Sequence, residues 1–235
     1  MDLSRNALLF DLPLMKRITS SRILLLGLGG VGGSAYISLV RHGVENITIV
    51  DFDTVHASNL NRQILFNSSD IGKLKVDIAR KVAEQINSDA KITPLNIKFP
   101  SEQIVINLND FDFVIDAIDD INAKVFLIEN CIIHEVPFIS CLGMGNRIDP
   151  SMVKCGYLSQ TEGDPLAKKL RSMLRLKSID LKRVNVVYSV ENPLRKEMPV
   201  GSTYSVPNVA GIFLAQRAID TIIKKECNHA KNQQD

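Results

Sequence analysis

Short apolar runs separated by helix-like stretches organise the first part of the chain. The runs lie at residues 23–26, 47–50, 91–99, 111–115 and 136–141. They are too short for core helices and read as strands, most of them buried between helices. Between them, apolar residues recur at helical spacing at residues 35–43, 72–86 and 123–135. Strands that alternate with helices predict an α/β fold with a doubly wound, mostly parallel sheet.

The pattern changes after Asp149. Residues 153–158 and 184–190 read as strands without the earlier strand–helix alternation, which indicates an antiparallel extension. Between them, residues 164–175 predict an amphipathic helix with a basic face, and residues 208–225 predict a closing helix. The apolar positions of the closing helix are Val209, Ile212, Phe213, Ala215, Ile219 and Ile222. We therefore expect a Rossmann-like, mostly parallel sheet with an antiparallel C-terminal extension.

Three other segments carry weaker patterns. Residues 2–17 predict one short amphipathic helix with Leu8, Leu9, Leu12 and Met15 on its apolar side. Ser101 is expected to cap a further short helix. The polar residues 228–235 are expected to fray at the end of the chain.

The first strand runs into a glycine-rich loop, GLGGVGG, at residues 27–33. The loop contains the G-x-G-x-x-G spacing, with Gly27, Gly29, Gly30 and Gly32 among its glycines. Such glycines let the backbone approach anionic oxygens, which the N–H groups at the start of the next helix then bind. Asp51 follows about 20 residues later, where such folds bind ribose hydroxyls. This predicts a nucleotide site, although similar turns also occur without a ligand, and NAD and ATP both remain possible.

Several charged residues are expected at the same edge of the sheet. Asp51 and Asp53 end the second strand, Asp116 and Asp119 end the fourth, and Arg62 and Lys75 approach from the next loop and helix. A dehydrogenase has no evident use for two cations and an aspartate beside the phosphates. Transfer of a nucleotidyl group does use them, because charge accumulates on the phosphoryl oxygens during attack at the α-phosphate of ATP. The alternative is that each residue belongs to an ordinary surface salt bridge, and Lys73 and Lys75 to a solvated helix end.

Composition fits a folded, sizeable domain. Of 235 residues, 45% are hydrophobic and 23% charged, and the net charge of +2 neither requires nor excludes nucleic acid. Residues 23–40 are uncharged and nearly reach the length of a membrane span, but the glycines within them favour soluble core. No N-terminal signal peptide is visible, since Arg5, Asp11 and Lys16 interrupt any apolar segment there.

The cysteines lie at positions 131, 141, 155 and 227 and form no C-x-x-C pair. This spacing argues against a zinc site built from paired thiolates and favours free thiols in a reducing, cytoplasmic location. Cys141 ends a predicted strand near the expected site and is the thiol to test for reactivity.

Five motifs together resemble the ThiF/MoeB/E1-like adenylating superfamily, in its order and spacing, over residues 20–145. They are the glycine loop, DFDTV at residues 51–55, SNLNRQ at residues 58–63, GKLK at residues 72–75 and DAID at residues 116–119. The resemblance implies an E1-like, homodimeric adenylation fold that activates a carboxylate with Mg-ATP. It implies roles in catalysis for Arg62, Lys75 and Asp119, with Asp119 linked to Mg²⁺. It implies nucleotide contacts for Gly27, Gly29, Gly30, Gly32, Asp51, Asp53, Asn59, Arg62, Lys75 and an N-terminal arginine, here Arg5, which would reach the neighbouring subunit's phosphates.

The second half resembles the tRNA threonylcarbamoyladenosine dehydratase branch, through residues 164–175, 187–191 and 205–211. This branch implies a ligase-type enzyme that releases AMP and pyrophosphate. It adenylates the carboxylate of threonylcarbamoyladenosine at position 37 of tRNA and closes it to the cyclic form. The alternatives are an adenylyltransferase for a ubiquitin-like sulfur carrier, a dinucleotide-dependent oxidoreductase and a catalytically silent ATP-binding module. Some members of the branch carry a cysteine before the closing helix for a sulfur-relay partner, but this chain has GSTYSVPN there.

A tRNA substrate requires a basic surface near the site. The candidates are Lys168, Lys169, Arg171, Arg175, Lys177, Lys182 and Arg183. The alternative is a solvated helix face with no ligand. We expect residues 1–235 to form a single E1-like ATP-binding domain, with residues 1–145 as the nucleotide-binding core and residues 146–235 as an extension that carries the basic helix.

Overall fold

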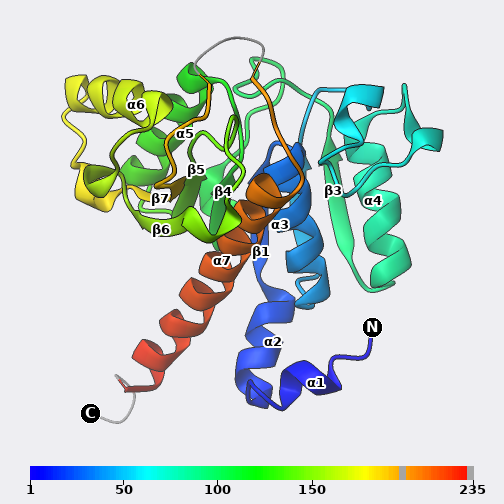
Figure 1. Ribbon diagram of the computed structural model, residues 1–235. Helices are drawn as coiled ribbons and strands as arrows, with labels where there is room; N and C mark the ends of the chain where they lie inside the picture. Colours follow the sequence, from blue (N-terminus) through cyan, green and yellow to red (C-terminus); the bar gives the residue numbers. More distant parts are fainter. Residues whose placement is uncertain (196–199, 232–235) are drawn as a thin grey trace.

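A computed structural model describes residues 1–195 and 200–231 of the protein, with residues 225–231 by their backbone only. Seven strands form one sheet in the order β3-β2-β1-β4-β5-β7-β6, with helices on both faces (Figure 1). The strands are β1 Arg22–Leu26, β2 Asn46–Val50, β3 Lys91–Leu95, β4 Phe113–Asp116, β5 Phe138–Cys141, β6 Val153–Tyr157 and β7 Asn185–Ser189. All neighbours run parallel except β6 and β7, which pair antiparallel. The predicted fold class, including the antiparallel extension, is confirmed.

The helices are α1 Ser4–Ala7, α2 Leu12–Ser20, α3 Gly30–Arg41, α4 Lys75–Ile86, α5 Ile121–Ile133, α6 Pro165–Leu176 and α7 Ser205–Lys231. They cover the sheet because its central strand is apolar on both faces. Ile23 and Leu25 of β1 are buried in a core with α2, α3, α4 and α7. Leu24 and Leu26 point to the other face, into a core with α5 and α6. None of the described helices combines the length and the apolar character that crossing a membrane requires.

Helix α7 crosses α3 at close range, which brings its N-terminal end beside the glycine loop. A Cβ atom on Gly211 would lie 2.2 Å from the carbonyl oxygen of Val31, so only glycine allows this approach. The hydroxyl of Ser34 also donates a hydrogen bond of 2.8 Å to the carbonyl oxygen of Asn208. The crossing therefore fixes the start of α7 against the start of α3.

The predicted single helix over residues 2–17 is wrong. The chain forms two helices instead, because Asp11 caps α2 and accepts a hydrogen bond from the N–H of Leu14, while Pro13 is accommodated in the first turn. Leu12 starts the second helix, and its side chain, like those of Leu8 and Leu9, is about 80% exposed. The N-terminal segment thus presents three large apolar side chains to solvent.

Three further predictions need correction. Ser101 accepts backbone hydrogen bonds from Gln103 and Ile104, as a helix cap does, but no helix follows it. Helix α7 starts at Ser205 and leaves Ile212 half exposed, although it was expected on the apolar side. Of the tail predicted to fray, residues 228–231 are helical, and residues 232–235 lie outside the described part of the chain.

Candidate active site

A cavity of about 560 Å³ opens at the carboxyl ends of β1, β2 and β4. The chain runs from β1 outward to β3 and then returns to β4 on the other side of β1, so the cavity lies at the switch point of the sheet. Its volume is within the range of small-ligand sites. Among its lining residues are the predicted Gly27, Gly29, Gly30, Asp51, Asp53, Asn59, Arg62, Lys75 and Asp119.

Close backbone contacts at Gly27 and Gly32 fix the shape of the glycine loop, whereas the space beside Gly29 is open. Gly27 has a φ of 91°, and a Cβ atom there would lie 2.6 Å from the carbonyl oxygen of Ala117. Gly32 does not line the cavity; a Cβ atom there would lie 1.8 Å from the carbonyl oxygen of Gly27, so Gly32 keeps the turn tight. A Cβ atom on Gly29, by contrast, would meet no atom within 4 Å. This open position lies at the uncapped N-terminus of α3, where an anionic group fits.

Asp51 connects the end of β2 to this loop. Its carboxylate accepts hydrogen bonds from the N–H groups of Leu28 at 2.6 Å and Asp53 at 2.8 Å. Burial raises the pKa of Asp51, whereas the Lys75 ammonium and these hydrogen bonds act in the opposite direction. The side chain is held at the cavity wall with an acceptor suited to ribose hydroxyls.

Lys75 is the first residue of α4 and is almost fully buried. A cation at this end of a helix opposes the helix dipole, and burying an ammonium is costly without a partner. Lys75 therefore pairs with Asp53, at 2.7 Å between Nζ and Oδ2. Lys73, in contrast, pairs with Asp70 at the surface, so the interpretation as solvated lysines fits Lys73 but not Lys75.

Arg62 and Asp119 line the cavity from different loops. The Arg62 guanidinium donates to the carbonyl oxygen of Ser58 at 2.7 Å and to Oδ1 of Asn61 at 2.8 Å. Asn59, nearby, accepts from the N–H of His56 and thereby orders this loop. Asp119 is exposed and, within residues 1–195 and 200–231, has no hydrogen-bond or ion-pair partner.

The acidic side chains at the cavity decide whether Mg²⁺ fits there. No group of three or more His, Cys, Asp or Glu able to hold a metal occurs among the described residues. Mg²⁺ at nucleotides needs only one or two carboxylates, with phosphate oxygens and waters completing the shell. A free carboxylate such as Asp119 beside an anion-binding loop fits that mode.

Two predicted residues lie apart from this cavity. Arg5 is in α1, at the opposite end of the molecule from the carboxyl ends of β1 and β4 (Figure 1). Cys141 is buried, and burial raises the pKa of its thiol to about 12, so it stays protonated near neutral pH. The structure therefore argues against a reactive Cys141.

Asp116 was expected beside the other charged residues at the edge of the sheet, but it does not line the cavity and belongs to a buried polar group behind it. Asp116 and Lys124 are fully buried and pair at 2.7 Å, and Ser140 donates to the same carboxylate oxygen at 2.5 Å. The second oxygen of Asp116 accepts from the N–H of Ile118, which orders the loop that carries Asp119. The signal in the sequence was Lys124 itself, a single cation within an otherwise apolar stretch of α5.

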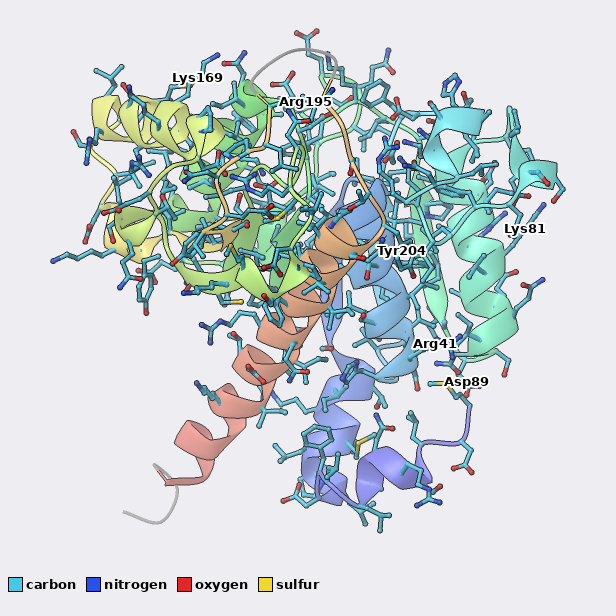
Figure 2. All side chains as sticks on the ribbon, viewed as in Figure 1. Arg41, Lys81, Asp89, Lys169, Arg195 and Tyr204 are labelled. Carbon is cyan, nitrogen blue, oxygen red and sulfur yellow. The ribbon has the colours of Figure 1, made fainter. Side chains whose placement is uncertain are left out.

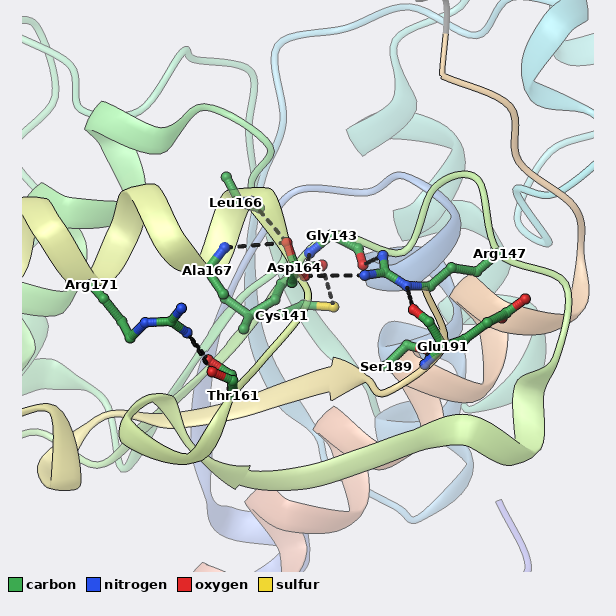
Figure 3. A network of polar contacts seen from close by, with 11 residues as sticks. Cys141, Gly143, Arg147, Thr161, Asp164, Leu166, Ala167, Arg171, Ser189 and Glu191 are labelled. Carbon is green, nitrogen blue, oxygen red and sulfur yellow. Dashed lines mark hydrogen bonds and ion pairs between the residues drawn. The ribbon is translucent and has the colours of Figure 1, made fainter. Parts of the chain in front are cut away.

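A second buried pair joins the loop after β5 to α6 (Figure 3). Arg147 and Asp164 lie 3.5 Å apart, and Asp164 also caps α6 through the N–H groups of Leu166 and Ala167. Arg171 of α6 donates to the carbonyl oxygen of Thr161 at 2.7 Å. Arg171 thus has a structural partner, which corrects its assignment to the free basic face.

The remaining basic side chains of α6, those of Lys168, Lys169 and Arg175, are exposed. Figure 2 shows Lys169 at the same end of the molecule at which the parallel strands finish. Hydrogen bonds from Ala123 and Asn122, and to a lesser extent the charges of Lys98 and Lys169, hold the pKa of Asp120 below its usual value. Asp120 and Lys98 both line the cavity. Lys98 had not been predicted, since it follows β3 as a lone cation.

Comparison with known proteins assigns the chain to a family. A model of the ThiF family matches residues 3–234. The chain is 34% identical to the tRNA threonylcarbamoyladenosine dehydratase of Bacillus subtilis (strain 168), over 94% of both chains. It is also 36% identical to the molybdopterin-synthase adenylyltransferase of Escherichia coli (strain K12), over 66% of this chain and 61% of that one. Among solved structures, the E. coli tRNA N6-threonylcarbamoyladenosine dehydratase in complex with ATP matches with a TM-score of 0.87 and 29% identity, over 96% of this chain and 95% of that chain.

Proposed function

This chain belongs to the ThiF family, and from that premise we propose that it is an ATP-dependent tRNA threonylcarbamoyladenosine dehydratase. The extent of similarity carries the proposal: the match to the Bacillus dehydratase spans 94% of this chain, whereas the match to the molybdopterin-synthase adenylyltransferase spans 66%.

The reaction begins with attack of the threonyl carboxylate on the α-phosphate of ATP. A bond forms between a carboxylate oxygen and the phosphorus, and the bond to the bridging oxygen breaks, so pyrophosphate leaves. Arg62 and Lys75 meet the growing negative charge, with the N–H groups of α3 behind the phosphates. A group of the same modified nucleoside then displaces AMP from the activated carbonyl, and the net change in the nucleoside is loss of one water.

Asp119 and Asp51 complete the nucleotide site. Asp51 accepts from the ribose hydroxyls while its hydrogen bonds to the glycine loop hold it in place. Asp119 would hold Mg²⁺, which neutralises charge on the phosphates. Because Asp119 has no partner in the described part of the chain, it is available for that role without breaking an existing contact.

The tRNA is proposed to bind across α6 and the mouth of the cavity. Lys168, Lys169 and Arg175 are exposed on α6, and the charge of Lys169 reaches Asp120 at the cavity. The extension and the nucleotide-binding core would work as one domain, residues 1–235, since β7 of the extension pairs with β5 of the core. A tRNA substrate also points to a cytoplasmic enzyme.

We further propose that the enzyme works as a homodimer. Leu8, Leu9 and Leu12 are each about 80% exposed on the N-terminal segment, and exposed large apolar side chains commonly mark interfaces between subunits. Arg5 lies on the same segment, away from its own cavity, so a second copy would be the one whose phosphates it reaches.

The decisive experiment is incubation of the protein with ATP and tRNA that carries threonylcarbamoyladenosine, followed by mass spectrometry of the nucleosides. Loss of one water from that nucleoside is expected, together with release of AMP and pyrophosphate. A protein that binds ATP but leaves the nucleoside unchanged would contradict the proposal. Pyrophosphate exchange stimulated by a carrier with a Gly-Gly end, and not by the tRNA, would instead support the sulfur-carrier alternative.

A further inference from the structure

The guanidinium of Arg62 is oriented by the residue before it. One nitrogen, Nη1, donates to Oδ1 of Asn61 at 2.8 Å and to the carbonyl oxygen of Ser58 at 2.7 Å. Asn61 itself does not line the cavity, whereas Arg62 does. Any influence of Asn61 on a bound nucleotide therefore passes through Arg62.

The amide of Asn61 is held from its other side by a distant segment. Its Nδ2 donates to the carbonyl oxygen of Ser202 at 3.0 Å, across 141 positions of sequence. A carbonyl only accepts and a guanidinium only donates. The amide therefore has one orientation that satisfies both neighbours: nitrogen toward Ser202 and oxygen toward Arg62.

The segment around Ser202 is anchored in turn. Gly201 donates to Oδ1 of Asn146 at 2.6 Å, and the N–H of Asn146 donates to the carbonyl oxygen of Gly201 at 2.7 Å. A few residues further on, Nδ2 of Asn208 donates to the carbonyl oxygen of Arg62 at 2.9 Å. Residues 200–208 thus hold Arg62 twice, through its backbone and, by way of Asn61, through its guanidinium.

We propose that Asn61 is a positioning residue that presets the Arg62 guanidinium for the nucleotide phosphates by linking it to Ser202. This role rests on the proposed function, in which Arg62 contacts those phosphates. An arginine side chain loses substantial rotamer freedom when it is fixed by a ligand, and an existing hydrogen bond reduces the freedom still to be lost.

The test is a double-mutant cycle with α,β-methylene ATP as the probe, measured by titration calorimetry. The four proteins are the unchanged chain, Asn61→Ala, Arg62→Ala and the double variant. We expect Asn61→Ala to weaken binding about five- to tenfold when Arg62 is present, as the loss of one hydrogen bond would, and less than about twofold when Arg62 is absent. A residue that merely stabilises the loop would weaken binding equally in both backgrounds.

Matched controls separate the outcomes. Asn109→Ala removes another exposed asparagine with local hydrogen bonds, outside the cavity, and should leave the affinity unchanged. The thermal midpoint of each variant checks folding. Failure of the unchanged chain to bind the probe would overturn the proposed function, and with it the role of Arg62. Binding by the unchanged chain with no effect of Asn61→Ala, or an equal effect in both backgrounds, would overturn the positioning role alone.

Discussion

Asp119 is a residue at which a loss of activity can be measured without a loss of stability. It is exposed and has no partner among the described residues, so Asp119→Asn removes a charge without breaking a contact. We expect adenylate formation, measured by pyrophosphate exchange, to fall about 10²- to 10³-fold, with the thermal midpoint unchanged. Glu162→Gln, at an exposed carboxylate outside the cavity, is the control. Retained exchange in Asp119→Asn would remove Asp119 from the proposed mechanism.

Cys141 allows a test by chemical modification. With its thiol pKa near 12, only roughly one molecule in ten thousand carries a thiolate there at pH 8. We expect iodoacetamide at that pH to spare Cys141 in the folded protein and to modify it after denaturation, as read by peptide mass spectrometry. The exposed Cys155 serves as the internal comparison, since its label should appear first. Rapid labelling of Cys141 in the native protein would argue that the thiol is accessible for chemistry.

Substitution by alanine should lower ATP affinity at Gly29, which precedes α3, but should lower stability at Gly211 of α7. Gly29→Ala adds a Cβ atom that meets nothing within 4 Å, so the free energy of unfolding should change by less than about 1 kcal/mol. Its methyl group would enter the cavity beside the N-terminus of α3, and ATP affinity should fall at least about tenfold. In Gly211→Ala, the added Cβ atom would clash with the backbone of α3. The free energy of unfolding, measured by urea denaturation, should fall by about 3 kcal/mol or more. Equal stability of the two variants would contradict the close crossing of α3 and α7.

The basic face of α6 predicts a loss of tRNA binding that leaves ATP binding intact. Lys168→Glu, Lys169→Glu and Arg175→Glu together should weaken tRNA binding at about 0.1 M salt and make its salt dependence shallower, because fewer counterions are released. Arg171 is kept, since its contact with Thr161 supports the start of the helix. Filter binding over a salt series measures the first effect, and calorimetry with the ATP analogue provides the control. If the dependence of tRNA affinity on salt concentration were unchanged, this face would be a solvated surface that does not contact tRNA.

Helices and strands could be predicted from the sequence where a short local run of apolar residues defines them. Strands β1, β2, β4 and β5 are apolar runs between turn residues, and their burial in the sheet follows from those runs. Strand β3 lies at the edge of the sheet, and none of its residues is fully buried. The break between α1 and α2 was missed because the apolar spacing of residues 2–17 outweighed Asp11, which caps α2, and Pro13, which a helix tolerates in its first turn. Gly27, Gly29, Gly30, Arg62, Lys75 and Asp119 line one cavity, as expected for parallel strands that end at a common edge, and their roles there stay predictions. The links from Asn61 to Ser202 and from Asp116 to Ser140 depend on tertiary contacts, which no local pattern records.

At the scale of the whole molecule, the position of Arg5 predicts that two chains share each active site. Arg5 lies far from its own cavity, beside the exposed Leu8 and Leu9, so the proposed dimer would bring it to the partner's phosphates. Arg5→Ala should therefore lower pyrophosphate exchange at least about tenfold, the loss expected for one charged contact to the phosphates. Light scattering should show that the variant is still dimeric.

Mixing two variants of low activity distinguishes action across the interface from action within one chain. In a mixed dimer of Arg5→Ala and Asp119→Asn, the first chain keeps Asp119 and receives Arg5 from the second, so one of the two sites is complete. Random exchange of equal amounts makes about half of the dimers mixed, and about a quarter of the unchanged activity should return. If Arg5 acted within its own chain, or not at the phosphates at all, the mixture would stay at the average of its two components. Leu9→Glu should abolish the recovery by preventing association, because a carboxylate buried in an apolar interface is strongly disfavoured.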